Sequence, residues 1–155
     1  MLGHIKLHQP KTILEVGCGF GRNLIFLTQH GIKSSQLTGV DFSSQLLDQA
    51  KVNLPRVKLY RASAQNLPFS KPKFDLSFTH GLLMHIPKPQ LALQEIIRVS
   101  HKWVIIIEET RHRARRINSF TWAHNYSKLF SLLPVKVMDT HHNKYNISGF
   151  LLKKI

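Results

Sequence analysis

Three glycines in five positions, set between two apolar runs, constrain this chain more than any other feature of its sequence. Residues 13–16 are apolar apart from one acid, the glycines are Gly17, Gly19 and Gly21, and residues 24–27 are apolar again. Glycine tolerates positive φ and lets the backbone approach a ligand closely. A helix that begins behind such a turn directs free N–H groups towards the turn. The stretch therefore predicts a strand, a ligand-binding turn and a helix, with an anionic group of the ligand near Gly19.

The same stretch distinguishes between classes of ligand. The fingerprint of nicotinamide and flavin sites places a third glycine where this chain has Arg22. Glu15 would repel a pyrophosphate, whereas it suits a ligand that carries an ammonium or sulfonium group. Asp41 follows about 20 residues after the turn, at the end of a second strand-like run, where a carboxylate can accept both hydroxyls of a ribose. A ligand with an amino-acid end, a positive sulfur, a ribose and no phosphate is S-adenosylmethionine.

Four blocks of sequence resemble those of the class I S-adenosylmethionine-dependent methyltransferases. The blocks occur in the order typical of that family, at residues 15–23, 39–43, 64–69 and 74–86. The most similar branch methylates small molecules and includes quinone-biosynthesis and sugar-pathway enzymes. The resemblance implies an α/β fold that is Rossmann-like, with a mostly parallel twisted sheet and helices on both faces. It also implies methyl transfer from S-adenosylmethionine as the cofactor.

The resemblance and the position of the turn together predict a set of cofactor-binding residues. Asp41 is expected to bind the ribose, and its alternative role is that of an acid at a helix start. The family often has an acid before the alanine of the third block, where this chain has Ser63, so adenine recognition is expected to rely on the backbone near Ala64. Cys18 is expected to be a small turn residue and not a nucleophile. The complete predicted set is Glu15, Gly17, Cys18, Gly19, Gly21, Asp41, Phe42, Ser63, Ala64 and Thr79.

The remaining sequence predicts strands alternating with helices in one S-adenosylmethionine-binding domain that spans residues 1–155. Further strands are expected at residues 37–41, 57–60, 74–79 and 103–107, and further helices at residues 44–54 and 89–99. Apolar side chains between Phe120 and Leu133 recur at helical spacing and predict another helix. The tail predicts a C-terminal antiparallel hairpin, formed by residues 135–139 and 145–153 around a turn at 141–144.

Two histidines are catalytic candidates. His80 follows the strand expected at 74–79 and would be a general base or a substrate contact, with a solvated turn histidine as the alternative. His85 has the same candidate role, with a packed or capping histidine as the alternative. The sequence identifies no certain catalytic residue, because an activated methyl group needs positioning first and a base only when the acceptor must lose a proton. His141 and His142 lack a third ligand at metal spacing, so no metal site is predicted.

Ligands of open α/β sheets bind outside the carboxyl ends of the strands. That rule makes residues after the strands at 74–79 and 103–107 candidates for substrate binding, and they are His80, Glu108, Arg111 and Arg113. Arginine is suited to bidentate binding of a carboxylate or phosphate. The alternative for the arginine cluster at residues 111–116 is a solvated loop.

The charge of the chain is strongly positive, with 22 Lys and Arg against 8 Asp and Glu and a formal net charge of +14. Such a balance favours anionic partners, or it reflects a generally basic proteome. The first choice is methyl transfer to a small metabolite. One form of this prediction is that the metabolite is anionic. RNA methylation through the basic surface is one alternative, although residues 79–82 do not match the block of nucleic-acid amino methyltransferases. A non-catalytic cofactor-binding subunit that activates a partner is another.

The sequence also carries information on location and assembly. No apolar run is as long as a membrane span, the first residues lack the apolar region of a signal peptide, and the single cysteine excludes an internal disulfide. A cytoplasmic protein without a membrane span is therefore expected. Only a short segment precedes the first strand, where family members carry helices that close over the cofactor. The alternatives are an open site, a site covered by a partner chain or a second copy in a homo-oligomer, and a shortened chain.

Overall fold

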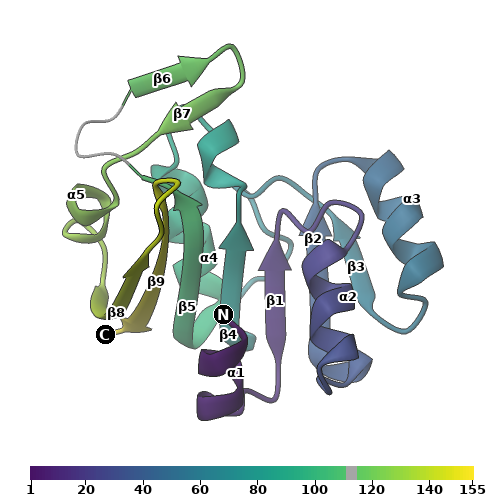
Figure 1. Cartoon of the computed structure of the whole chain (residues 1–155). Coiled ribbons are helices and arrows are strands. Elements are labelled where there is room, and N and C mark those ends of the chain that lie inside the picture. Colours follow the sequence, from purple (N-terminus) through teal and green to yellow (C-terminus); the bar gives the residue numbers. More distant parts are fainter. Residues whose placement is uncertain (111–114) are drawn as a thin grey trace.

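A seven-stranded sheet with helices on both faces forms the body of the protein (Figure 1). The computed structural model describes residues 1–110 and 115–155. The strand order is β3-β2-β1-β4-β5-β9-β8, in which the first five strands are parallel and β9 runs antiparallel between β5 and β8. The predicted Rossmann-like α/β fold with a C-terminal antiparallel hairpin is confirmed.

The strands of this sheet are β1 (Ile13–Val16), β2 (Leu37–Asp41), β3 (Lys58–Arg61), β4 (Phe74–His80), β5 (Ser100–Glu109), β8 (Val135–His142) and β9 (Ile147–Lys154). The α-helices are α1 (Leu2–His8), α2 (Arg22–Gln29), α3 (Ser44–Asn53), α4 (Gln90–Val99) and α5 (Tyr126–Phe130), with 3-10 turns η1 (Ser34–Gln36) and η2 (Leu83–His85). None of the helices in the described ranges is long and apolar enough to cross a membrane.

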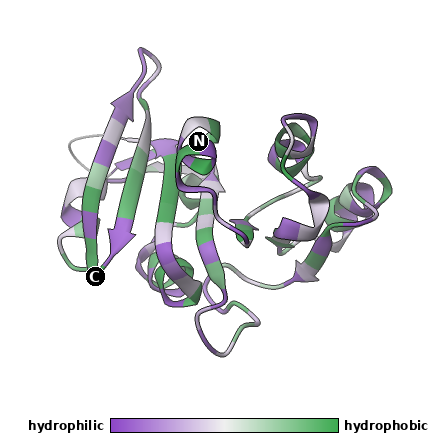
Figure 2. Ribbon diagram, turned by 90° about the horizontal axis from the view of Figure 1, so that it is seen from below, coloured by the Kyte–Doolittle hydropathy of each residue, from purple (hydrophilic) through white to green (hydrophobic). Residues whose placement is uncertain are grey.

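Two hydrophobic clusters cover the two faces of the sheet. Helices α1, α2 and α3 contribute Ile5, Leu24 and Leu47 to the cluster on one face. Helices α4 and α5 contribute Leu93 and Tyr126 to the cluster on the other face. Figure 2, which views the molecule from below, separates α1, α2 and α3 from α4 across the sheet. The two faces therefore have separate cores, and each strand residue belongs to one of them by its alternation along the strand.

Parallel pairing brings the ends of the central strands to one edge of the sheet. Strand β1 pairs with β2 and with β4, so that Glu15 is level with Gly39 and Phe78. All four residues of β1 are buried, as expected for a central parallel strand. The turns that follow β1, β2 and β4 consequently lie at the same edge, and the site is assembled there.

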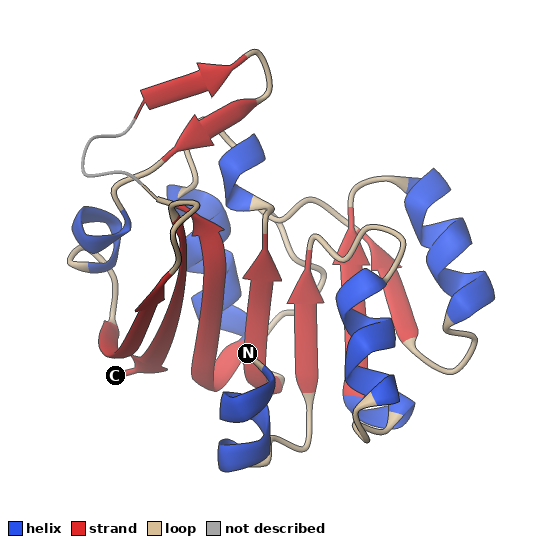
Figure 3. Ribbon diagram, viewed as in Figure 1, coloured by secondary structure: helices blue, strands red, loops and turns tan. Residues whose placement is uncertain are grey.

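The helix predicted between Phe120 and Leu133 is confirmed only in part, as the short α5, and its earlier residues are not helical. The chain forms a small hairpin of β6 (Arg115–Asn118) and β7 (Thr121–Ala123) before the short α5 (Figure 3). The Asn118 side chain accepts a hydrogen bond from the Phe120 amide at 2.9 Å and fixes the tight turn between the strands. The helical spacing arose from residues of separate elements, because antiparallel pairing and turn chemistry prevailed over the local periodicity.

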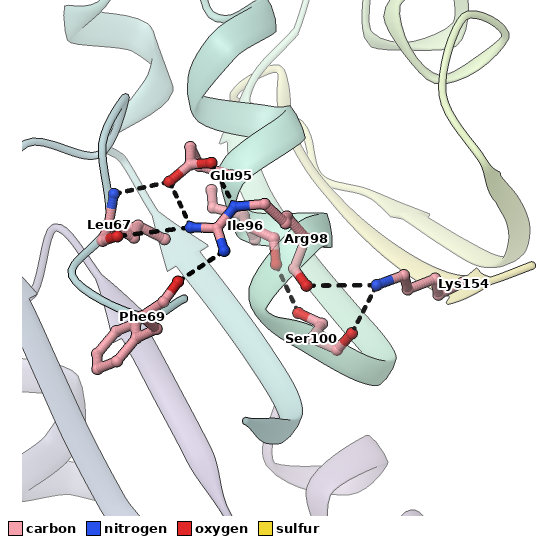
Figure 4. A network of polar contacts seen from close by, with 7 residues as sticks. All are labelled: Leu67, Phe69, Glu95, Ile96, Arg98, Ser100 and Lys154. Carbon is pink, nitrogen blue, oxygen red and sulfur yellow. Dashed lines mark hydrogen bonds and ion pairs between the residues drawn. The ribbon is translucent and has the colours of Figure 1, made fainter. Parts of the chain in front are cut away.

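A polar clamp holds the loop between β3 and β4, which contains the third sequence block (Figure 4). The Glu95 carboxylate of α4 accepts a bond from the Leu67 amide at 2.8 Å. Arg98 donates to the Phe69 carbonyl at 2.6 Å and to both oxygens of Glu95 at 2.6 and 2.8 Å. The guanidinium thus ties residues 67–69 to the helix on the α4 face.

Replacing Arg98 by alanine should lower the free energy of unfolding by about 1–2 kcal/mol, because several hydrogen bonds of a charged group are lost. Urea denaturation of the wild type and R98A would measure the difference. Arg56→Ala is the matched control, since Arg56 is exposed and lies outside the clamp. Equal losses in the two variants would argue against a specific role for the clamp.

Candidate functional site

The glycine turn after β1 has the backbone conformation that the sequence predicts. Gly17, Gly19 and Gly21 have φ values of 78°, 53° and 89°, which side-chain-bearing residues rarely adopt. The amides of Gly17 and Cys18 both donate to the Val40 carbonyl, at 2.7 and 3.0 Å. The turn is therefore fixed against the end of β2, and α2 begins directly behind it.

The three glycines differ in what surrounds them. A Cβ atom at Gly17 would lie 2.8 Å from the Leu82 side chain, and one at Gly21 would lie 2.6 Å from Leu54. A Cβ atom at Gly19 would meet only one atom, at 3.9 Å. Packing within the protein thus requires glycine at the first and third positions. At Gly19 the turn leaves open space, which fits close approach of a ligand.

Asp41, at the end of β2, joins the two turns at this edge. One carboxylate oxygen accepts from the Gly19 amide at 2.7 Å, and the other accepts from the Ser43 amide at 2.9 Å. Ser43 itself caps α3 by accepting from the Leu46 amide at 3.3 Å. Ser43, and not Asp41, is therefore the cap of α3. Asp41 is half-buried, and its two oxygens keep lone pairs that these two bonds do not use. Phe42 follows with its side chain 72% exposed.

Glu15 is the most unusual charged group of the site. Its side chain is fully buried, one oxygen accepts from the Asn23 amide group at 2.6 Å, and the other oxygen has no partner among the described residues. Burial raises the pKa of Glu15 to about 8, although the Asn23 bond acts in the opposite direction. A buried carboxylate with an unpartnered oxygen fits a cationic group of a ligand. Asn23 was missed as a site residue, and its place in the first turn behind the glycines was the available signal.

The structure gives Glu108 a different role from the substrate contact that the sequence suggests. Its buried carboxylate accepts from the amides of Leu82, Leu83 and Met84, at 2.9, 3.0 and 3.2 Å. The Thr79 hydroxyl donates to it at 3.3 Å, so the hydroxyl of this predicted cofactor contact is bound to a buried carboxylate. Burial raises the pKa of Glu108 to about 7 against these four bonds. Glu108 thus fixes the turn after β4 through its amides. That turn places the Leu82 side chain against Gly17.

His80 is the last residue of β4 and is half-buried. Its Nδ1 atom is shielded from solvent and has no hydrogen-bond partner within residues 1–110 and 115–155. Burial and, secondarily, the charge of Arg22 lower the pKa of His80, so the imidazole is neutral at pH 7. A neutral imidazole at the carboxyl end of a strand can accept a proton or a hydrogen bond. The solvated turn histidine of the sequence prediction does not describe this environment.

His85 packs against the hairpin that follows β5. Its Nδ1 atom lies 2.9 Å from the Phe120 carbonyl, and the ring is exposed. His124, the residue after β7, makes a similar contact, with Nε2 3.1 Å from the Leu83 carbonyl. The two histidines attach the β6–β7 hairpin to η2, and Figure 1 shows the hairpin beyond the ends of β4 and β5. This geometry supports the packing alternative for His85.

The remaining predicted residues occupy varied positions. The Ser63 hydroxyl accepts from the Gln65 amide at 3.2 Å, and Ala64 packs against the core of the α4 face. Cys18 is buried against Gly39, and burial raises the pKa of its thiol. Across residues 1–110 and 115–155, no group of three His, Cys, Asp or Glu side chains is arranged as a metal site.

The predicted substrate residues Arg111 and Arg113 lie outside the described residues. Two other arginines of the cluster are seen in β6, where Arg115 is exposed. The Arg116 guanidinium lies 5.7 Å from the centre of the Trp122 ring and donates to the Asn118 carbonyl at 2.9 Å. Arg116 is thus bound within its own hairpin.

Comparison with protein families places this geometry in context. The family model described as "Methyltransferase domain" matches residues 13–102. A ubiquinone/menaquinone biosynthesis C-methyltransferase from Campylobacter jejuni is 30% identical over 162 residues, which cover 96% of this chain and 67% of the relative. An uncharacterized methyltransferase from Synechocystis is 31% identical over 101 residues, or 65% of this chain and 45% of the relative. The chain therefore spans about half to two thirds of the length of these relatives.

Solved structures share the fold at low sequence identity. The PH0226 protein from Pyrococcus horikoshii OT3 has a TM-score of 0.78 at 13% identity, with 99% of this chain and 88% of that chain covered. The magnesium protoporphyrin IX methyltransferase from Synechocystis PCC 6803, solved with bound S-adenosylmethionine, has a TM-score of 0.73 at 14% identity. That alignment covers 93% of this chain and 70% of the other.

The raised pKa of Glu15 makes stability depend on pH. The unfolded chain loses this proton near pH 4.5 and the folded chain near pH 8, so the folded state binds more protons between these values. The free energy of unfolding should then decrease with rising pH, by up to about 1.4 kcal/mol per unit from this group. In Glu15→Gln this contribution should vanish, which denaturation at pH 6, 7 and 8 would measure. The exposed Asp48→Asn is the control, and parallel curves for E15Q and the wild type would contradict the assignment.

Proposed function

The chain belongs to the methyltransferase-domain family of class I S-adenosylmethionine-dependent methyltransferases, and from that membership we propose that it transfers the methyl group of S-adenosylmethionine to a small metabolite. Residues 1–155 would act as one cofactor-binding and catalytic domain. The observation that carries the proposal is the buried, half-unpartnered carboxylate of Glu15 beside an open Gly19. A site that combines these two features suits a ligand with both a cationic and a carboxylate end.

Different residues at this edge of the sheet would bind different parts of the cofactor. Glu15 would pair with a cationic group, which lowers its pKa from about 8 and ionises the carboxyl group as the ligand binds. The amides at the start of α2 would bind a carboxylate. Asp41 would accept the ribose hydroxyls with its free lone pairs, and the exposed Phe42 would offer its ring as an apolar contact. Bound S-adenosylmethionine supplies a methyl carbon that its positive sulfur makes electrophilic.

The protein's contribution to the reaction is mainly positioning. Transfer to an activated methyl carbon requires the acceptor atom to be held in line with it, and orientation can supply a large part of the rate. A base is needed only for an acceptor that must lose a proton, and His80 would then take that proton as a neutral imidazole. His80 is consequently the catalytic candidate, while His85 is attached to the hairpin.

The class of acceptor is supported by the relatives. A quinone-biosynthesis enzyme is among them, and a porphyrin methyltransferase shares the fold, so both substrates named there are small organic molecules. Whether the acceptor of this chain is anionic stays a prediction, as do contacts from Arg111 and Arg113. RNA methylation, a non-catalytic partner-activating role and a cytoplasmic location also stay predictions from the sequence, without further support from the described residues.

Cofactor affinity tests the assignment of the edge residues. Asp41→Ala should weaken S-adenosylmethionine binding by about 1.5–3 kcal/mol, or about 10- to 150-fold, because a charged hydrogen-bond acceptor is lost. Gly19→Val should weaken it further by occupying the open space and straining a positive φ. Titration calorimetry measures both, with the exposed Asp48→Ala as the control. Unchanged affinity in both site variants would refute the cofactor site.

Methyl transfer itself can be followed with cofactor that carries a labelled methyl group. Incubated with a cell extract, the wild-type protein should label small molecules, and Asp41→Ala should label them at least 10-fold more slowly at low cofactor concentration. Chromatography separates labelled metabolites from labelled RNA. Label found in RNA would replace the proposed acceptor class, and absence of any label with intact cofactor binding would favour the non-catalytic role.

A further inference from the structure

A row of residues crosses four strands at the carboxyl end of β4. His80 pairs with Ile107, Ile107 pairs with Gly149, and Gly149 pairs with His141. Residues directly opposite one another across strands point to the same face of a sheet. That face also carries Glu15, because Glu15 pairs with Phe78, and Phe78 and His80 lie on the same face of β4. The row therefore begins beside the glycine turn and ends at the outer strand β8.

A second, parallel row provides an apolar floor. Phe78 pairs with Ile105, Ile105 with Leu151, and Leu151 with Asp139. Asp139 in turn binds His4 of α1, with the carboxylate oxygen 3.1 Å from Nε2. The row thus runs from a buried phenylalanine to a carboxylate that lies against the His4 ring of α1.

A cavity of about 470 Å³ lies over these rows. Its lining includes His80, Ile107, Gly149 and His141 of the first row, and α1 forms part of its wall. Gly149 has no side chain to fill the space, and a Cβ atom there would approach its nearest neighbour, Ile107, no closer than 4.0 Å. The glycine therefore produces a hollow between the two histidines.

The dimensions and polarity of the hollow restrict what it can bind. Neighbouring strands are about 4.8 Å apart, so three spacings separate His80 from His141 by about 14 Å. Between them the floor is apolar, through Ile105, Ile107 and Leu151. At the ends lie hydrogen-bond acceptors, namely imidazole nitrogens of His80 and His141 and the Asp139 carboxylate. An occupant that matches this pattern has an apolar middle and a donor at each end.

We propose that this trough holds the methyl acceptor, and that the acceptor is an elongated molecule with an apolar middle and a hydroxyl group at each end. The inference rests on the proposed methyl transfer, since it names the acceptor class for that site. The hydroxyl beside His80 lies at the end nearest the glycine turn. Its proton passes to the imidazole, which becomes an imidazolium ion, and the oxygen keeps the electron pair as an anion. His141 and Asp139 bind the opposite hydroxyl and fix the length of the molecule.

Binding of a fluorescent probe with this shape tests the trough without methyl transfer. 4,4′-Dihydroxystilbene should bind the wild-type protein saturably, and 4,4′-dimethoxystilbene, which has no donors, should bind at least 10-fold more weakly. Gly149→Leu should reduce the affinity for the diol at least 10-fold by filling the hollow. Gly3→Leu is the matched control, because Gly3 is exposed with no neighbour within 4 Å and lies outside the trough. Equal diol affinity in G149L and the wild type would overturn the proposal.

A second variant, H141L, keeps the proposal testable if G149L does not fold. His141 is exposed, so His141→Leu should keep the fold and should weaken the diol about 10-fold, while phenol, which reaches one end only, should bind as in the wild type. A diol affinity that H141L leaves unchanged would also overturn the two-ended site. Calorimetry with S-adenosylmethionine on the same proteins separates the two levels. If the wild type binds the cofactor but the variants bind the diol as well as the wild type does, only the acceptor class is refuted. If the wild type does not bind the cofactor, the proposed function is refuted.

Discussion

The site depends on the parallel pairing of β1 with β2 and β4. That pairing sets Glu15 level with Gly39 and Phe78, and it brings the turns after all three strands to one edge. The glycine turn is then fixed by two bonds to the Val40 carbonyl and by the bond from Gly19 to Asp41. Every group assigned to the cofactor follows from this arrangement, because each lies within a few residues of a strand end.

Two buried carboxylates at this edge have opposite roles because they are differently satisfied. Glu108 receives three backbone amides and one hydroxyl, so it serves the structure and orders the turn after β4. In the part of the chain that the structure describes, Glu15 accepts a hydrogen bond only from Asn23, and its second oxygen has no partner. An unsatisfied buried polar group costs about 1–3 kcal/mol. A ligand cation that pairs with the second oxygen of Glu15 would remove that cost, and the affinity for the ligand would increase accordingly.

The antiparallel strand β9 extends the site away from the cofactor edge. By inserting between β5 and β8, it places Gly149 between Ile107 and His141 and leaves the hollow that begins at His80. The β6–β7 hairpin lies beyond the same strand ends and is attached to η2 through His85 and His124 (Figure 1). The proposed methyl-donor and acceptor regions thus belong to different parts of one sheet, the parallel half and the antiparallel end.

Local chemistry in the sequence determined the glycine turn, the carboxylate of Asp41 and the Ser43 cap, since each depends on neighbours in the chain. Tertiary structure decided the rest. The periodicity between Phe120 and Leu133 predicted one helix, but hairpin pairing takes its first residues and only the short α5 remains helical. No local pattern shows that Glu108 would be enclosed by amides from residues 82–84, or that His141 would stand in one row with His80. Those contacts join distant segments, and strand pairing across the sheet fixes them only when the whole chain is folded.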